Sequence, residues 1–294
     1  MNPQQPQDLQ VIFQDADLLA INKPAGLLSH GQADVDSVLR RVQRREADAG
    51  RDPKEIHLVH RLDRDTSGVM LLARNLEAAN LLNQLFRERK VHKVYFAVCS
   101  PLPALRWTRV VQALKPRRIG GGEYMTVVPE GLQADSEVEV FARGRRLGLV
   151  RVLPDQGRKH QVRVALASLG APICGDFLYG GALSARLAKR VLLHARSLEF
   201  AHPRTGLHVS LRSPLPQDFK ELLTEDGCVL PGDLDRRHRA DAKQGSGPAT
   251  LTPAQTEQMQ ARSAAVKMPR TLPGYRPTRA PAKSAKGPRP DQQE

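Results

Sequence analysis

The stretch HRLDRDTSGVMLLAR, residues 60–74, joins a short polar loop to a run of apolar residues. Residues 66–68, Thr-Ser-Gly, have the composition of a tight turn. The apolar run that follows predicts a strand buried on both faces. Asp63 lies in the loop between Arg61 and Arg64, so one carboxylate is placed among fixed cations beside a core strand. A charged surface turn has the same composition, and the rest of the chain must decide between the two interpretations.

Strand and helix patterns continue on both sides of this stretch. Residues 9–13 and 17–22 are typical of two strands joined as a hairpin. A helix is expected from about Asp36 to Glu46, and a second from Asn75 to about Lys90, where apolar residues recur on one face at helical spacing. Residues 91–98 alternate between apolar and polar, which predicts a strand with one core face and one face that presents a lysine and a tyrosine.

Many further strands and few helices are expected downstream. The strand-like stretches are residues 107–114, 137–143, 147–153, 191–200 and 207–211. This pattern predicts an α+β fold with a mixed, largely antiparallel sheet core and peripheral helices. We divide the chain into a disordered N-terminus (residues 1–8), one domain (residues 9–230) and a C-terminal tail (residues 236–294).

Charge and composition favour a polyanionic partner. The chain has 294 residues, a net charge of +14 and a pI of about 10.2, which indicate nucleic acid rather than a small neutral ligand. The tail, residues 236–294, holds 12 Lys or Arg against 4 Asp or Glu, together with eight prolines and one aromatic residue. It is therefore expected to be disordered. Such a tail either attracts phosphates without sequence preference or only solubilises the protein.

Cysteine usage and hydropathy restrict the remaining classes. The three cysteines are scattered and lack ligand spacing, so neither a disulfide framework nor a metal site is expected. No apolar run approaches the roughly 18 residues of a membrane span, and the N-terminus does not resemble a signal peptide. We expect a cytoplasmic, monomeric protein.

A second polar cluster, GRKHQVR at residues 157–163, is expected to open a helix that Gly170 ends. Arg158 and Lys159 oppose the helix dipole there by roughly 0.3–1 kcal/mol each, so a sequence selected only for stability would prefer acidic residues. The pattern indicates an anion site for a phosphate or a carboxylate. An arginine that anchors a distant surface glutamate is the alternative. We interpret residues 175–181 as an ordinary turn and His194 as a buried core histidine.

Five segments in order carry a resemblance to a known family: HRLD with TSG (residues 60–68), KVY (93–95), GRKHQVR (157–163), GD with YG (175–180), and HA with HPRTG (194–206). Together they resemble the RluA family of pseudouridine synthases, over about Val11 to Pro214. Two positions depart from the family pattern, Gln156 for a common threonine and Ala165 for a common histidine. The S4-like RNA-binding domain of many relatives is not expected here, and the basic tail would partly replace it.

The resemblance implies a pseudouridine synthase fold in which residues 9–230 form the catalytic domain. The implied reaction isomerises uridine in a ribosomal or transfer RNA stem-loop and needs neither cofactor nor metal. Asp63 would attack C1′ of the ribose or remove a proton. Arg158 would pair with Asp63 and lower its pKa. Tyr95 would stack on the base and take part in removing the C5 proton. The remaining implied contacts are Arg61 in the space vacated by the extruded base, Leu193 against the pocket, and Lys23, Lys159 and Arg163 on phosphates.

Two other functions fit parts of the same sequence. A catalytically inactive RNA-binding or ribosome-assembly protein could use the same scaffold. A phosphodiester hydrolase could use Asp63 and Asp65 on a metal ion, although no further acidic ligands are visible nearby.

Overall fold

The computed structural model describes residues 9–32, 35–119, 122–235 and 249–250. The predicted disordered N-terminus (residues 1–8) and almost all of the predicted tail (residues 236–294) lie outside the described residues. Within the described residues, no helix is both long and apolar enough to cross a membrane.

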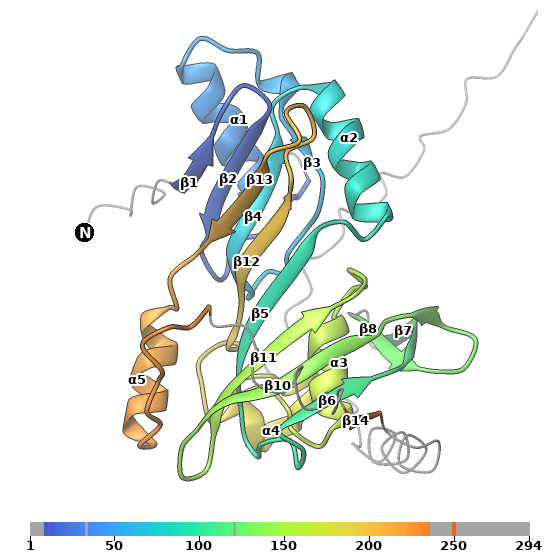
Figure 1. Ribbon diagram of the computed structural model, residues 1–294, viewed down its shortest axis with the longest axis vertical. Helices are drawn as coiled ribbons and strands as arrows, with labels where there is room; N and C mark the ends of the chain where they lie inside the picture. Colours follow the sequence, from blue (N-terminus) through green and yellow to red (C-terminus); the bar gives the residue numbers. More distant parts are fainter. Residues whose placement is uncertain (1–8, 33–34, 120–121, 236–248, 251–294) are drawn as a thin grey trace, which may run out of the picture.

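The fold is built on an 11-stranded sheet with the order β1-β2-β4-β12-β5-β11-β10-β6-β14 (Figure 1). Strand β13 pairs with β12, and β3 pairs with β4. The strands are β1 (Gln10–Gln14), β2 (Leu18–Lys23), β3 (His57–Leu58), β4 (Ser67–Ala73), β5 (His92–Cys99), β6 (Trp107–Val110), β10 (Ser136–Arg143), β11 (Gly148–Pro154), β12 (Leu193–Ala201), β13 (His208–Arg212) and β14 (Ala249–Thr250). Of the pairs in this described sheet, β12 with β4 and β14 with β6 are parallel and the others antiparallel. The predicted α+β class is confirmed.

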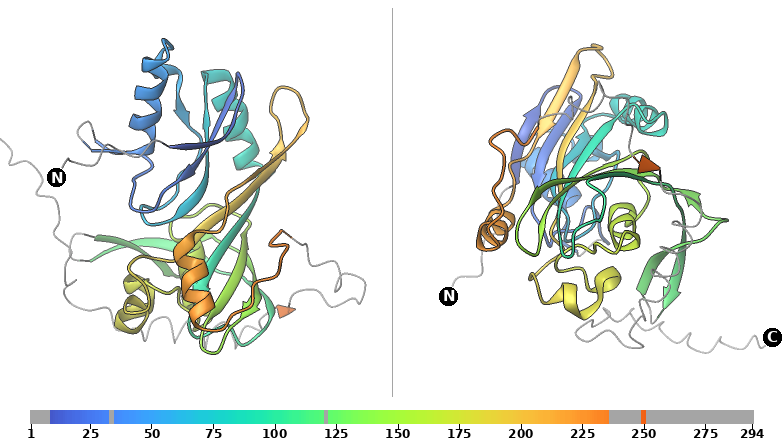
Figure 2. Two further views of the ribbon diagram at one scale, coloured as in Figure 1. Left: turned by 90° about the vertical axis from the view of Figure 1, so that its left-hand side faces the viewer. Right: turned by 60° about the horizontal axis from the view of Figure 1, so that its bottom comes forward.

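Five described helices lie around this sheet: α1 (Val38–Asp48), α2 (Leu76–Arg87), α3 (Gln161–Ser168), α4 (Phe177–Ala185) and α5 (Gln217–Glu225). A single 3-10 turn, η1 (Pro53–Glu55), follows α1. Two halves are visible in Figures 1 and 2: one holds β1–β4 with α1 and α2, and the other holds β6–β11 with α3 and α4. Strands β5 and β12 run through both halves and pair with each other.

Strand β4 shows why the first motif is followed by a nearly uninterrupted apolar run. All seven of its residues are buried. Val69 and Leu71 pack in a cluster with Leu82 of α2, whereas Met70 and Leu72 pack with the α1 side of the molecule. A strand covered on both faces has no solvent-facing positions, so its sequence does not alternate between apolar and polar residues.

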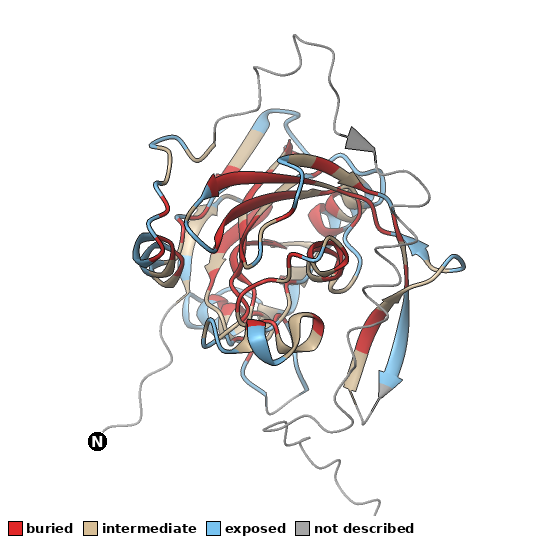
Figure 3. Cartoon of the chain, turned by 90° about the horizontal axis from the view of Figure 1, so that it is seen from below, coloured by how far each residue is buried: buried red, intermediate tan, exposed pale blue. Residues whose placement is uncertain are grey.

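A larger core lies beneath the central strands. It joins β5, β10 and β11 to α3 and α5. Figure 3 shows buried residues gathered along these strands and on the helices beside them, while exposed residues follow the outer loops and helix faces. The resulting framework holds the ends of β5, β11 and β12, and the loop before β4, in fixed positions.

Several local expectations differ from the structure. The helix expected to begin at about Asp36 begins at Val38 with Ser37 as its cap, and Asp36 forms an ion pair with Arg41. The expected strand at residues 107–114 ends at Val110, and the chain then enters a separate three-stranded sheet of β7 (Ala113–Ile119), β8 (Gly122–Val127) and β9 (Leu132–Gln133). Residues 177–185 form a helix with a kink at Gly181 instead of an ordinary turn.

Candidate active site

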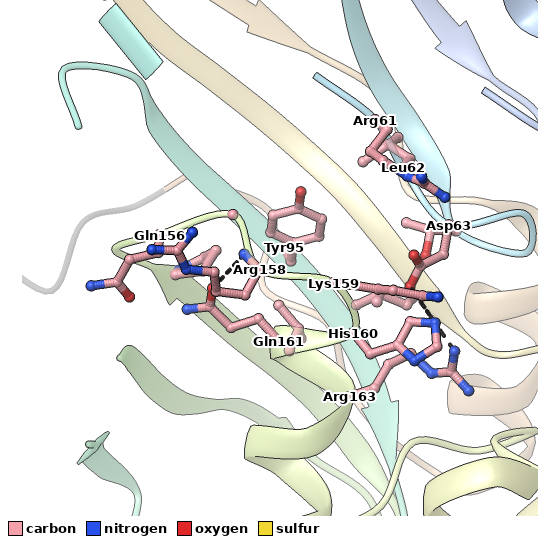
Figure 4. Close-up of a pocket in the computed structure, with 15 residues that line it drawn as sticks. Arg61, Leu62, Asp63, Tyr95, Gln156, Arg158, Lys159, His160, Gln161 and Arg163 are labelled. Carbon is pink, nitrogen blue, oxygen red and sulfur yellow. Dashed lines mark hydrogen bonds and ion pairs between the residues drawn. The ribbon is translucent and has the colours of Figure 1, made fainter. Parts of the chain in front are cut away.

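A pocket brings the two sequence motifs together (Figure 4). Its lining residues are Arg61, Leu62, Asp63, Thr66, Tyr95, Pro154, Gln156, Gly157, Arg158, Lys159, His160, Gln161, Val162, Arg163 and Leu193. All the predicted site residues except Lys23 are among them. The loop before β4 supplies one wall, the segment leading into α3 supplies the other, and β5 and β12 supply the floor.

Hydrogen bonds to buried groups fix the loop that carries Asp63. Leu62 is buried, and its backbone N–H donates to Ser29 Oγ at 3.0 Å while Ser29 Oγ donates to the Leu62 carbonyl at 2.7 Å. The Thr66 N–H donates to the Asp63 carbonyl at 3.1 Å and closes a turn. The backbone is held on both sides of Asp63, so its carboxylate has a defined direction into the pocket.

Lys23 supports this loop from below, and the expectation that it contacts an RNA phosphate is wrong. Its side chain is fully buried, and Nζ donates to the carbonyls of Pro24, Arg64 and Thr66 at 2.8–2.9 Å. Burial lowers the pKa of Lys23 to about 8, although Asp65 and Asp63 oppose that shift. Three carbonyls occupy the three donors of the ammonium, so none is left for a ligand.

Arg163, not Arg158, is the arginine next to Asp63. Arg163 Nη1 lies 4.0 Å from Asp63 Oδ2, while its Nε and Nη2 form a bidentate pair with Asp176 at 2.8 and 2.7 Å. The expected Arg158–Asp63 pair is absent: Arg158 Nε donates to the Gln133 carbonyl at 3.2 Å. Figure 4 shows Arg158 on one side of Tyr95 and Asp63 with Arg163 on the other.

The position at which α3 begins explains why Arg163, rather than Arg158, lies next to Asp63. Helix α3 begins at Gln161, so Arg158 and Lys159 precede it, and Arg163 occupies the first turn. The predicted phosphate contact for Arg163 is wrong as well, because its side chain is 11% exposed, forms a bidentate pair with Asp176 and faces Asp63.

Burial dominates the electrostatics of the pocket. It raises the pKa of Asp63, and the opposing effects of Arg163, Arg61 and Lys159 do not reverse the direction. An arginine does lower this pKa as expected, but it is Arg163 rather than Arg158, and burial outweighs its effect. Burial, and then the charge of Asp63, raises the pKa of Tyr95 well above the ordinary value of a phenol.

The other predicted residues occupy distinct places around the pocket. Tyr95 and Leu193 come from the paired strands β5 and β12, and Leu193 is buried. Arg61 is exposed at the rim. Lys159 donates from Nζ to Glu123 Oε1 of β8 at 2.7 Å and remains partly exposed. His194 is buried as expected, with Nδ1 2.9 Å from Ser67 Oγ.

Comparison with known proteins decides the family. The family model described as RNA pseudouridylate synthase matches residues 17–168. The chain belongs to this family. It is 37% identical to ribosomal large subunit pseudouridine synthase D of Xylella fastidiosa, over 76% of this chain and 73% of the relative. It is 33% identical to ribosomal large subunit pseudouridine synthase C of Pasteurella multocida, over 73% of this chain and 67% of that protein.

Comparison with solved structures supports the assignment of the chain to this family. The human RNA pseudouridylate synthase domain containing 4 superposes with a TM-score of 0.62 at 29% identity, and the match covers 76% of this chain and 94% of that one. The RluA-type resemblance is confirmed, and the chain is an RNA pseudouridine synthase that isomerises uridine in RNA.

In this pseudouridine synthase three site residues escaped prediction from sequence: His160, Asp176 and Tyr179. His160 Nε2 lies 3.8 Å from Asp63 Oδ2, and burial, then Arg163 and Lys159, lower its pKa to about 3. Asp176 holds Arg163 and also accepts from the Tyr179 N–H as the cap of α4. The segment at residues 175–180 was part of the resemblance, but its glycines favoured a turn over a helix start.

Proposed function

We propose that this enzyme converts uridine to pseudouridine in ribosomal RNA, with transfer RNA as a second candidate, and that Asp63 is its essential carboxylate. The supporting observation is that Asp63 and Tyr95 line one pocket in which two donors approach the carboxylate without closing on it. Relatives named as ribosomal large subunit pseudouridine synthases support ribosomal RNA as the target class.

The reaction breaks the N1–C1′ glycosidic bond, rotates the uracil and forms a C5–C1′ bond. C5 loses a proton and N1 gains one, so atoms and electrons balance without an external reagent. Asp63 in its ionised form either attacks C1′ or removes a ribose proton to give a glycal, and both routes use the same carboxylate. We propose that no cofactor or metal takes part.

Arg163 keeps the carboxylate available in this form. At about 4 Å and an effective dielectric of about 20, one cation attracts it by roughly 4 kcal/mol, which offsets part of the desolvation. A direct hydrogen bond of normal length would hold the carboxylate more tightly and make it a weaker base and nucleophile. The observed separation of 4.0 Å leaves Oδ2 free to approach a ribose.

Tyr95 and Leu193 form the place for the base. We propose that Tyr95 stacks on the uracil and that its Oη contacts the edge from which the C5 proton leaves. The raised pKa keeps the phenol protonated at neutral pH, so another group must finally accept the C5 proton. Leu193, on the neighbouring strand β12, adds an apolar contact for the base.

The target base must leave its stem or loop, which costs a few kcal/mol of unstacking. The exposed Arg61 at the rim is placed to fill the vacated space. Arg158 and Lys159 stand on the other wall, and we propose that they contact the RNA backbone. Arg158 is assigned to binding because its guanidinium donates to the Gln133 carbonyl and forms no ion pair with Asp63.

The decisive test compares wild type with Asp63→Asn, with Asp65→Asn in the same loop as the matched control. We expect Asp63→Asn to bind RNA with unchanged affinity and to form no pseudouridine, whereas Asp65→Asn retains turnover. An inactive RNA-binding protein would give no product with any of the three chains. Full activity in EDTA, with the RNA chain uncut, would argue against a metal-dependent hydrolase.

Mapping of pseudouridine in RNA from a deletion strain, with rescue by the wild-type chain, would identify the target uridine. Ribosomal RNA as the target would be refuted if only transfer RNA positions were lost. We further propose that the enzyme acts as a cytoplasmic monomer, which sedimentation and cell fractionation would check.

A further inference from the structure

A chain of hydrogen bonds runs from the β7–β9 sheet to the pocket. The Met125 N–H of β8 donates to Tyr179 Oη at 2.9 Å, and Tyr179 Oη lies 2.8 Å from His160 Nδ1. On the other side of the same imidazole, Nε2 lies 3.8 Å from Asp63 Oδ2. Four residues from four separate segments therefore form one connected path that ends at the carboxylate.

The donors and acceptors along this path fix the tautomer of His160. Tyr179 Oη already accepts from a backbone N–H, and within the described part of the chain His160 Nδ1 is the acceptor that its O–H reaches. The phenol therefore donates to Nδ1. A neutral imidazole carries one proton, so this proton is on Nε2, the atom that faces Asp63.

Both rings are buried and held in place. His160 is 10% exposed, and the pKa of its imidazole, lowered to about 3, keeps it neutral in the range where the enzyme would work. The Tyr179 ring meets the His160 ring edge-on at 5.6 Å and lies 5.0 Å from the Arg163 guanidinium carbon. Neither ring can turn without losing these contacts.

The backbone at His160 supports a specific use of this residue. His160 has φ 54°, in the left-handed region that a residue other than glycine rarely adopts. Such a conformation costs free energy and persists where the surroundings demand it. Here it turns the chain into α3 and directs the imidazole towards the loop of Asp63.

We propose that His160 is a positioning residue for Asp63 and that Tyr179 acts through it. Tyr179 holds His160 in the Nε2–H tautomer, so that an N–H dipole orients the reactive carboxylate and favours its ionised form. At 3.8 Å this contact is longer than a hydrogen bond, and it closes when substrate fills the pocket. The inference rests on the catalytic role proposed for Asp63.

The charged and titratable groups that face Asp63 are Arg163, Arg61, Lys159, Lys23, His160 and Tyr95, with Asp176 behind Arg163. The variant Tyr179→Phe changes none of these charges and keeps the ring on Arg163, and it removes only the hydroxyl. Tyr124→Phe is the matched control, because Tyr124 is buried on the same strand as Met125 and in the same apolar cluster, while its hydroxyl is outside the path.

We expect Tyr179→Phe to lower kcat roughly 10-fold, with KM for RNA unchanged. This is about the effect expected when the charged Asp63 carboxylate loses the Nε2–H of His160 as a hydrogen-bond donor. The acidic limb of the pH–kcat profile should move to higher pH, since the ionised carboxylate loses a donor. Tyr124→Phe should change neither. A fall in stability with unchanged kcat and pH limb in Tyr179→Phe would overturn the proposal.

A second variant tests the path itself. Asparagine tolerates the left-handed region, so His160→Asn keeps the backbone and removes the imidazole. It should lower kcat to a similar degree, and adding Tyr179→Phe to His160→Asn should cause no further loss. Additive losses would mean that Tyr179 acts by another route, and the proposal would fail.

Nitrogen NMR of ¹⁵N-histidine-labelled enzyme gives a readout independent of activity. We expect His160 to be protonated on Nε2 alone between pH 5 and pH 8 and to gain an Nδ1–H population in Tyr179→Phe. A protonated Nδ1 in wild type would refute the tautomer assignment. An active Asp63→Asn with the expected spectrum would instead refute the proposed role of Asp63, so the two failures are distinguishable.

Discussion

Replacement of Asp176 by asparagine is expected to damage stability and to alter the site chemistry in a defined direction. Asp176 is 1% exposed, and its two oxygens accept from Arg163 at 2.7 and 2.8 Å. The change leaves an arginine that is 11% exposed without its bidentate partner. Breaking one side of a buried ion pair costs about 3–5 kcal/mol.

The same substitution should make Asp63 more acidic. Asp176 is among the groups that raise the pKa of Asp63, and its removal also frees Arg163 to move closer to that carboxylate. We therefore expect the acidic limb of the pH–kcat profile to move to lower pH, and kcat on the plateau to fall because a more tightly held carboxylate is a weaker nucleophile.

Urea denaturation and pH-dependent kcat measure the two effects. Asparagine keeps an oxygen for the Tyr179 N–H, so Asp176→Asn isolates the ion pair, and Asp176→Ala should cost about 1 kcal/mol more through the lost helix cap. A stability loss below about 1 kcal/mol in Asp176→Asn, or an acidic limb that moves upward, would refute this reasoning.

Three further outcomes follow from the structure. Folding raises the pKa of Asp63, so the stability that this group contributes is fully present at low pH and is lost as the pH rises through the folded pKa. Asp63→Asn should therefore leave the free energy of unfolding at pH 7 unchanged or higher. A clear loss of this free energy in urea denaturation would contradict the raised pKa. Lys23→Met should destabilise the fold by about 2–4 kcal/mol and disorder the Asp63 loop, because three buried carbonyls lose their donor, whereas a fully active variant of wild-type stability would contradict that role. Deletion of residues 236–294, which carry a net charge of +8, should weaken RNA binding and flatten its salt dependence without abolishing turnover; an identical salt slope would assign the tail to solubility alone.

The parts of the fold that follow from sequence are those where local pattern and tertiary environment agree. Strand β4 could be predicted because α1 and α2 bury both faces and leave its apolar run uninterrupted. Helix α2 could be predicted because Asn75 caps it as the pattern requires. The β7–β9 sheet was missed because β7 contains Pro116 and three basic residues, and β9 has only two residues, so neither shows an apolar alternation.

The candidate site shows a similar division. Asp63 and Tyr95 were expected in one pocket from motif resemblance, and they line it. The arginine next to Asp63 could not be chosen from sequence, because the choice depends on where α3 begins and on Asp176, which is 13 residues beyond Arg163. Lys23 was expected to bind a phosphate because the sequence around it does not show that its ammonium donates to the carbonyls of Arg64 and Thr66, which lie far away along the chain.

The pocket is divided between the two halves of the fold. Asp63 stands on a loop held by Ser29 and Lys23 in the half with α1 and α2, whereas Arg163 of α3 and His160 just before it lie in the other half. A chain in which only one half has folded would carry either the Asp63 carboxylate without the Arg163 guanidinium or the reverse. Under the role proposed for Asp63, glycosidic bond cleavage therefore requires both halves to be folded.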